Sequence, residues 1–339
     1  MQKRVSLGDV AKAAGVDRAT ASRALSNHPH VAKATRERLR ALAERLGYRP
    51  DPALAAMARD RWLGRAGRNA NAIAYVAMRA GAEREEPCAG ARDEADKLGW
   101  RLEFFALAAY PSPAALARVL VARGIQGMLL RLERPGAVVE GWPWERFAAA
   151  HVSLPPDRAP WLDAATPDVF GLHLQAMREV LARGYRRPGL VLQGPRFLAD
   201  ELRRVGGCLA AWHEAGGRGR PPPLWWLDEG EAVEQAHALR AWVEAERLDA
   251  VLGQTDLVAE RLGVTRGEAG ELGYVSLSEG GRGGGLARAL PDLREVGARA
   301  LRLVAARLHQ RETGLPAQPI QVQVPGGWSE GRSLPGRMT

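Results

Sequence analysis

Residues 6–25 read SLGDVAKAAGVDRATASRAL, a pattern that predicts two short helices joined by a tight turn. Ser6 and Asp9 have the spacing of a capping box, in which each side chain accepts a hydrogen bond from a backbone N–H of the first turn. Gly15 is the residue type that turns most easily at the end of a helix. Asp17 is a favourable N-cap for the second helix, which we expect to begin at the next residue.

The second predicted helix, residues 18–25, has two different sides. Ala21 and Leu25 are four residues apart, so they form an apolar side that can pack on the first helix. The other side carries arginines, hydroxyls and a small residue near the N-terminus, which fits a recognition helix in the major groove. Arginine suits this role because its fork can bond guanine O6 and N7 together. A solvated amphipathic helix pair is the alternative, and this motif alone does not decide between them.

Two further helices are expected before residue 60. One is predicted from Lys33 to Leu46, with Leu39 and Leu42 also at helical spacing along its apolar side. The segment DPALAAMA (51–58) predicts a short helix that its aspartate caps, with proline tolerated at the first helical position. Such a short helix is marginal alone in water, so it needs a partner.

Residues 5–59 resemble the DNA-binding headpiece of the lactose-repressor and galactose-repressor family of bacterial transcription regulators. The resemblance rests on LGDVAKAAGV, the ATASRAL helix, HVAKATRERLRALAERLGYRPDP and the hinge segment ALAAMA. It implies base contacts from Arg18, Ala19 and Arg23 and a hinge that enters the minor groove. Thr20, Ser22 and His30 are expected to lie near phosphates. The implied DNA-binding residues are Arg18, Ala19, Thr20, Ser22, Arg23, His30, Met57 and Ala58.

Three residues depart from the family pattern. Ala19 stands where many relatives have a longer polar side chain, so its contact could only be apolar, for example with a thymine methyl, which implies a different operator. Ala32 replaces the serine that usually caps the third helix, and losing that cap should cost about 0.5 to 2 kcal/mol. Met57 replaces a leucine that wedges into a base step. Methionine can also act as a wedge, and it can pack against a partner helix in the same dimer.

Positive charge is concentrated at the N-terminal end of the chain. Residues 1–68 contain 15 Lys and Arg against 6 Asp and Glu, and their net charge of +9 equals that of all 339 residues. The remaining 271 residues balance, with 33 of each sign. A polyanion-binding segment attached to a neutral domain explains this distribution.

The N-terminus MQKRVSLGDV lacks the apolar segment of a signal peptide, and no stretch approaches a membrane span. We therefore expect a cytoplasmic protein with no membrane partner. Cys88 and Cys208 lack metal-ligand spacing and are expected to be buried thiols in a reducing compartment. We expect neither a metal nor a cofactor.

Short apolar runs alternate with helical segments from residue 72 onward, which predicts parallel sheets with right-handed crossovers. Two such α/β lobes are typical of a type I periplasmic-binding-protein-like core, as the family resemblance also implies. The predicted division is a helix-turn-helix headpiece (1–50), a hinge helix and linker (51–71), and an effector-binding and dimerisation core (72–339). The expected strands are 72–78, 101–107, 125–131, 147–153, 188–194, 224–227, 249–253, 273–278 and 320–324.

The resemblance extends through the core in ARGIQGMLLR, ARGYRR and VPGGWSEGRSL, and it implies a small effector in a cleft between the lobes. Arg204 matches the arginine with which relatives hold sugar hydroxyls or carboxylates, although it could equally be a solvent-facing charge. Gln254 matches an asparagine. Ser278 and Glu279 stand where many sugar-binding relatives have an aspartate, which weakens the case for a sugar. Three other residues are expected in the core or on the surface rather than in the site: His151, His173 and Trp225.

Enzyme motifs are incomplete in this chain. Residues 327–331 spell G-x-S-x-G, but a nucleophile elbow needs acid and histidine partners further along, and none of the eight following residues is Asp, Glu or His. The run GGRGGG (280–285) lacks the G-x-G-x-x-G spacing and is better explained as a loop lining the cleft. We therefore expect no catalytic residues.

These observations together predict a homodimeric, operator-binding transcription regulator. We expect a repressor whose DNA affinity is controlled by a small molecule, such as a sugar or another metabolite. One alternative is a nonspecific architectural DNA-binding protein. Another is a sugar or nucleoside enzyme with a basic appendage. An extracytoplasmic solute-binding protein would explain the core but has no use for residues 5–59.

Overall fold

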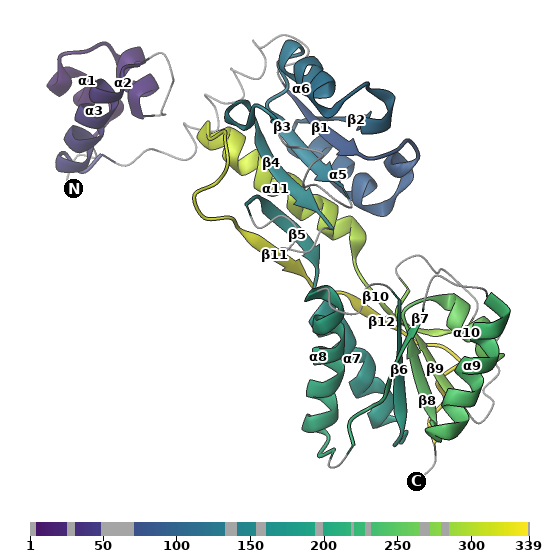
Figure 1. Ribbon diagram of the computed structural model, residues 1–339. Helices are drawn as coiled ribbons and strands as arrows, with labels where there is room; N and C mark the ends of the chain where they lie inside the picture. Colours follow the sequence, from purple (N-terminus) through teal and green to yellow (C-terminus); the bar gives the residue numbers. More distant parts are fainter. Residues whose placement is uncertain are drawn as a thin grey trace. The chain divides into compact units, whose positions relative to one another are not determined.

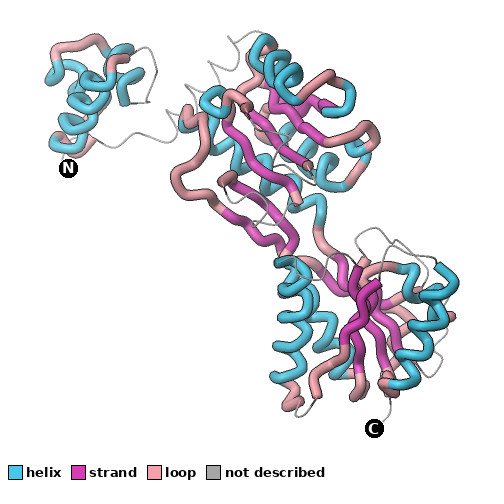
Figure 2. Tube along the Cα trace, viewed as in Figure 1, coloured by secondary structure: helices cyan, strands magenta, loops and turns pink. Residues whose placement is uncertain are grey.

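The computed structural model shows a small helical bundle and two α/β parts along one chain (Figure 1; Figure 2). Compact unit 1 comprises Met1–Leu154, Arg158–Ala164 and Gly297–Ile320, and unit 2 comprises Pro155–Asp157, Ala165–Val296 and Gln321–Thr339. The structure describes residues 5–25, 31–48, 71–132, 141–153, 161–193, 199–217, 220–227, 232–264, 272–278 and 285–337. The predicted hinge helix, residues 51–58, lies outside these ranges.

The headpiece consists of α1 (Leu7–Ala14), α2 (Arg18–Leu25) and α3 (Lys33–Arg45) around a small apolar core. The capping box is present: the N–H of Asp9 donates to Ser6 Oγ (3.3 Å) and the N–H of Ser6 donates to Asp9 Oδ2 (2.8 Å). Gly15 ends α1 in the left-handed conformation, with φ of +67°. These local predictions are confirmed. The core residues are Val10, Ala24, Leu39 and Ala43.

The third helix differs from the prediction at its C-terminal end. Leu46 lies just beyond α3 and is 37% exposed, so it does not belong to the buried face, which Leu39 and Ala43 form instead. Leu46 stands seven residues after Leu39, a spacing that keeps the same side only while the helix continues, and α3 ends at Arg45. Ala32 makes no side-chain cap at the N-terminus of α3, as the sequence predicts.

The first six-stranded sheet has the order β11-β5-β4-β3-β1-β2, of which β4, β3, β1 and β2 lie in unit 1, whereas β11 and most of β5 belong to unit 2. β1 pairs in parallel with β2 and β3, and β3 pairs in parallel with β4. Apolar residues of α6 pack on one face of this sheet, and α5 and α11 lie over the other. The elements are β1 (Ala72–Ala77), α5 (Glu86–Lys97), β2 (Arg101–Ala106), α6 (Pro113–Ala122), β3 (Gly127–Arg131), β4 (Ala148–Val152), β5 (Asp163–Pro167), α11 (Leu293–Gln310) and β11 (Gln321–Val324).

Unit 2 contains a second six-stranded sheet in the order β12-β10-β9-β8-β6-β7. Its strands pair in parallel except for β12, which is antiparallel to β10. Figure 1 shows α7 and α8 on one face of this sheet and α9 and α10 on the other. The elements are α7 (Val169–Ala182), β6 (Pro188–Gln193), α8 (Ala199–Glu214), β7 (Leu224–Leu227), α9 (Ala232–Ala245), β8 (Ala250–Gly253), α10 (Asp256–Leu262), β9 (Gly273–Ser276), β10 (Ala287–Leu290) and β12 (Gly327–Ser329).

Three strands were not predicted, namely β5, β10 and β12. Each is short, and β5 and β10 contain a charged residue, Asp163 and Arg288, that is almost fully buried. Such residues break the apolar pattern from which strands are predicted, and their partners are distant in the sequence. Asp163, for example, accepts a hydrogen bond from the N–H of Ile320 (2.8 Å).

A glycine allows α8 to lie directly against α7. A Cβ built on Gly207 would come within 2.3 Å of the carbonyl oxygen of Phe170 and 2.9 Å of the backbone nitrogen of Leu174. A Cβ on the neighbouring Gly206 would meet only the ring of Phe170, at an ordinary 3.6 Å. The backbones of the two helices therefore approach each other at residue 207 more closely than any side chain would allow.

We expect Gly207→Ala to destabilise unit 2 by about 1 to 3 kcal/mol, because the added methyl group must force the two helix backbones apart. Gly206→Ala is the matched control on the same helix. It should leave stability unchanged or raise it by about 0.5 to 1 kcal/mol, since alanine is the better helix former. Denaturant unfolding of both variants measures the difference, and equal effects would contradict this account of the packing.

Candidate functional site

The predicted recognition helix α2 exposes the side that the sequence assigns to DNA. Arg18, Ala19, Ser22 and Arg23 are exposed, whereas Ala21 and Ala24 are fully buried in the headpiece core. Leu25 is half-buried against that core, so the apolar side of the helix includes one more alanine than the spacing alone indicated. The bundle thus holds α2 with its polar side facing solvent.

Asp17 fixes the N-terminus of α2. Its Oδ1 accepts a hydrogen bond from the N–H of Thr20 (2.8 Å), and its Oδ2 accepts one from the Thr20 hydroxyl. The hydrogen bond from the Thr20 hydroxyl, and to a smaller extent the one from the Thr20 N–H, hold the pKa of Asp17 below its usual value. The Thr20 hydroxyl is thereby engaged within the helix cap, so the predicted phosphate contact of Thr20 would have to share this hydroxyl with Asp17. Three predicted contact residues lie outside the described residues: His30, Met57 and Ala58.

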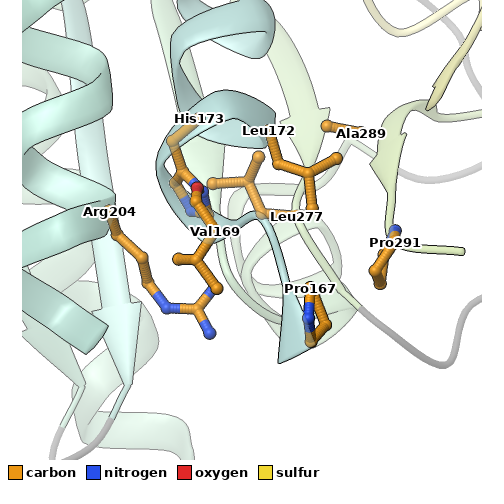
Figure 3. Close-up of a pocket in the computed structure, with 8 residues that line it drawn as sticks. All are labelled: Pro167, Val169, Leu172, His173, Arg204, Leu277, Ala289 and Pro291. Carbon is orange, nitrogen blue, oxygen red and sulfur yellow. The ribbon is translucent and has the colours of Figure 1, made fainter. Parts of the chain in front are cut away.

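Unit 2 contains a small pocket between α7, α8 and the sheet. It opens beside the first turn of α7 and includes one residue of α8, and Figure 3 shows the Arg204 side chain running from α8 toward Val169. Both helices belong to the pair that meets at Gly207, so the same close approach brings Arg204 to the pocket. The lining residues are Pro167, Val169, Leu172, His173, Arg204, Leu277, Ala289 and Pro291.

Arg204 is a buried residue. Its side chain is 11% exposed, so the alternative interpretation of a solvent-facing charge is wrong. Its Nε lies 3.5 Å from Oε2 of Glu201, one helical turn earlier, but this nitrogen makes no hydrogen bond. A buried guanidinium with an unsatisfied N–H is unusual, because such a group normally finds an acceptor.

His173 lies in the wall of the same pocket and is 2% exposed. Its Nδ1 is 2.8 Å from the carbonyl oxygen of Val169, which can only accept, so Nδ1 carries the proton and Nε2 is a bare acceptor. Nε2 has no hydrogen-bond partner. Burial, and secondarily the charge of Arg204, lower the pKa of His173 to about 3, so the ring is neutral at physiological pH. No local pattern around His173 indicates that this core histidine borders a pocket.

Two other predicted effector residues that the structure describes, Gln254 and Ser278, do not line this pocket. Gln254 is half-buried after β8, and its Oε1 accepts a hydrogen bond from the backbone N–H of Gln193 (2.6 Å), which ties the ends of β6 and β8 together. The N–H of Ser278 donates to Ser276 Oγ (3.3 Å). Glu279 lies outside the described residues. His151 is a core residue, and Trp225 packs against Trp242, as the sequence predicts.

A buried ionic group that sequence reasoning missed joins three elements of unit 2. Arg288 on β10 is paired with Asp256 at the start of α10 (2.9 Å), and Nη1 of Arg288 also donates to Ser276 Oγ on β9 (3.0 Å). Burial raises the pKa of Asp256, but hydrogen bonds from Arg288 and Ser276 outweigh it, so the pKa lies below its usual value. Asp256 follows Gln254 by two residues, so its pairing with Arg288 anchors the segment between β8 and α10 that contains Gln254.

The fold and the exposed α2 define a class: proteins with a helix-turn-helix headpiece and a type I periplasmic-binding-protein-like core. Residues 6–51 match the family model described as bacterial regulatory proteins, lacI family. The sucrose operon repressors of Shigella flexneri and Escherichia coli are each 26% identical to this chain over 226 residues. That alignment spans 62% of this chain and 62% of each repressor's length.

Solved structures share the fold along almost the whole chain. A transcriptional regulator CelR–cellobiose complex has a TM-score of 0.56 at 18% identity and covers 97% of this chain and 100% of its own. A lac repressor dimer bound to operator and an anti-inducer has a TM-score of 0.56 at 18% identity, and the match covers 98% of this chain and 100% of the repressor chain. A LacI-family regulatory protein from Chloroflexus aggregans has a TM-score of 0.58 at 15% identity, and the match covers 78% of this chain and 98% of that protein. The chain is therefore similar to lacI-family regulators: residues 6–51 match that family's model, and the solved structures share its fold.

Across the described residues, none of the helices has both the length and the apolar character that crossing a membrane requires.

The Arg288–Asp256 pair predicts a pH-dependent stability. We expect Arg288→Met to cost about 1 to 3 kcal/mol at neutral pH, a value reduced from that of a fully buried pair because Asp256 is one-third exposed. The folded-state pKa of Asp256 is depressed, so the contribution of the pair is present above pH about 4 and is lost as pH falls through that pKa. The cost of the substitution should therefore shrink below pH about 4.

Arg178→Met provides the control, because Arg178 pairs with Glu214 on the surface, where both side chains are about half exposed. Its removal should leave unfolding almost unchanged. Urea unfolding of the wild-type protein and both variants between acid and neutral pH tests the assignment. An Arg288→Met cost that is independent of pH would show that Asp256 is not the partner that matters.

Proposed function

We propose that this chain is a sequence-specific DNA-binding transcription regulator, most simply a repressor, whose operator affinity is controlled by a small molecule bound in its core. The observation that carries the proposal is α2. It presents two arginines, an alanine and a serine to solvent, while its opposite side is buried in a capped three-helix bundle. That arrangement is what a major-groove reading helix requires.

The headpiece also has the charge that DNA binding needs. The net charge of +9 within residues 1–68 supplies attraction to the phosphate backbone, which dominates affinity but carries no sequence information. Arg18 and Arg23 would then read base edges, and Ala19 would contact an apolar group such as a thymine methyl. His30, Met57 and Ala58 complete the proposed DNA-contacting set.

The relatives support an effector-controlled regulator. Two are sucrose operon repressors, one solved neighbour is a regulator with cellobiose, and another is a repressor dimer on its operator. We propose by analogy that this chain acts as a homodimer in the cytoplasm, with headpiece 1–50, hinge and linker 51–71, and core 72–339. Arg204 would contact the effector, and Gln254, Ser278 and Glu279 are proposed as further contacts. An effector can regulate only if it binds the two core arrangements with different affinities.

Two other functions are less well supported. An architectural DNA-binding protein needs no pocket in its core, whereas unit 2 has one with an unsatisfied arginine. An enzyme built on the G-x-S-x-G motif would need Ser329 at a strand-to-helix turn, whereas this serine lies in β12, and the described residues after it form no helix. We therefore propose that the chain is not an enzyme.

Selection of bound sequences from a random DNA pool by the full-length protein tests the function most directly. At physiological salt, which weakens nonspecific phosphate binding, we expect a palindromic consensus with a flexible pyrimidine–purine step at its centre. Recovery of no consensus would favour the architectural alternative.

Arg23→Ala should weaken binding to that consensus by about 1 to 3 kcal/mol and relax the preference at one base position of each half-site. Arg40→Ala, an exposed arginine on α3, is the charge-matched control. It should weaken binding to all sequences alike and leave the preference intact. Fluorescence anisotropy with the consensus and its single-base variants measures both effects. Unchanged affinity and preference for Arg23→Ala would contradict the assignment of α2.

A further inference from the structure

The residue that caps α2 carries a negative charge in a headpiece whose net charge is positive. Asp17 is exposed, as are Arg18 and Ala19, which follow it, and the first turn of α2 contains no acidic residue. In a helix-turn-helix protein the N-terminal residues of the second helix lie at base edges. Serine caps a helix about as well as aspartate does, so capping alone does not require a charge at this place.

The hydrogen bonds around Asp17 leave only acceptors at the start of α2. Oδ1 of Asp17 accepts the N–H of Thr20 (2.8 Å) and Oδ2 accepts the Thr20 hydroxyl. A carboxylate has about four acceptor positions, so about two remain for another donor. The Thr20 hydroxyl donates its one proton to Asp17, so its oxygen can otherwise only accept. These two bonds also hold the carboxylate in one orientation.

An exposed, oriented carboxylate discriminates among the groups that DNA offers. Phosphate oxygens are negatively charged acceptors, so Asp17 repels the DNA backbone whatever the sequence. In the major groove guanine presents N7 and O6, thymine presents O4, and adenine presents N7 beside its N6 amine. Cytosine alone presents a donor, its N4 amine, without an acceptor. It is therefore the base that this carboxylate matches best.

We propose that Asp17 is a specificity-determining residue, which selects one cytosine in each half-site through its N4 amine and disfavours DNA that lacks it. Its neighbour Arg18 has the opposite hydrogen-bonding character and suits the O6 and N7 atoms of guanine, so the two residues together match a C·G pair. This inference rests on the proposed function, because it names a base that a sequence-specific regulator would read.

Selection from a random DNA pool by the wild-type protein and by Asp17→Ser tests the role of the carboxylate. Serine keeps the helix cap, removes the charge, and can bond to either a donor or an acceptor on a base. We expect one position of each half-site to change from cytosine to no preference, while the other positions stay the same. Identical consensus sequences, or a change at a position that is not cytosine, would overturn the inference.

Fluorescence anisotropy measures the size of the effect. In the test operator, thymine replaces the selected cytosine in both half-sites. The wild-type protein should bind this operator at least about tenfold more weakly than the consensus, whereas Asp17→Ser should bind the two within about twofold. Asp17→Ser should also bind random-sequence DNA severalfold more tightly, because the phosphates no longer face a like charge. Equal discrimination by the two proteins would reduce Asp17 to a helix cap and overturn the inference.

Glu37→Gln is the charge-matched control, because Glu37 lies on α3 with its side chain 63% exposed. It should change binding to all sequences alike and leave the cytosine preference intact. Circular dichroism melting shows whether Asp17→Ser is folded. If it is not, Asp17→Asn decides, since asparagine caps equally well and its amide can also donate. That variant should lose most of the discrimination between cytosine and thymine.

The same selection separates this inference from the proposed function. A wild-type protein that selects no consensus would contradict the proposed function, and the role of Asp17 with it. A wild-type consensus that Asp17→Ser reproduces in full would support the sequence-specific regulator and contradict only the assignment of Asp17.

Discussion

The contact on which unit 2 depends most is the approach of two helix backbones at Gly207. There α8 lies so close to the Phe170 carbonyl of α7 that even a methyl group has no room. Unit 1 has an equivalent contact, since a Cβ on Gly297 of α11 would lie 1.8 Å from the carbonyl oxygen of Pro87 on α5. In both units a glycine thus replaces side-chain packing with direct contact between helices. In unit 2 this contact also brings Arg204 of α8 and His173 of α7 to the lining of the same pocket.

This packing explains why the pocket's polar groups lack partners. Two helices held together at their backbones cannot move to satisfy an arginine and a histidine between them, so both stay buried with unmet hydrogen bonds. Elsewhere in the same unit the charges are satisfied: Arg288 has Asp256 and Ser276, and Asp256 has a lowered pKa as a result. The contrast distinguishes a group that stabilises the fold from one that is available to a ligand.

Much of the fold could be predicted because its signals are local. The Ser6–Asp9 capping box, the turn at Gly15 and the apolar strands from residue 72 each depend on neighbours within a few positions. The strand β10 and the role of His173 could not be predicted, because Arg288 and His173 are buried by residues distant in the chain. The assignment of Arg204 and Gln254 to an effector site stays a prediction. Arg204 lines the pocket of unit 2, whereas the amide oxygen of Gln254 accepts a hydrogen bond from the backbone N–H of Gln193 on β6.

The sequence positions of the pocket residues bear on how a ligand could act at a distance. Three of the places where the chain passes between the two units are at residues 164/165, 296/297 and 320/321. Pro167 lies three residues after the first of these connections, and Pro291 lies six residues before the second. The lining of the pocket therefore includes both segments just where they enter or leave unit 2, and proline fixes the backbone φ angle at each of these positions. If the two arrangements of the core differ in the course of these segments, an effector that contacts them would bind the two with different affinity, which is the condition for shifting their populations.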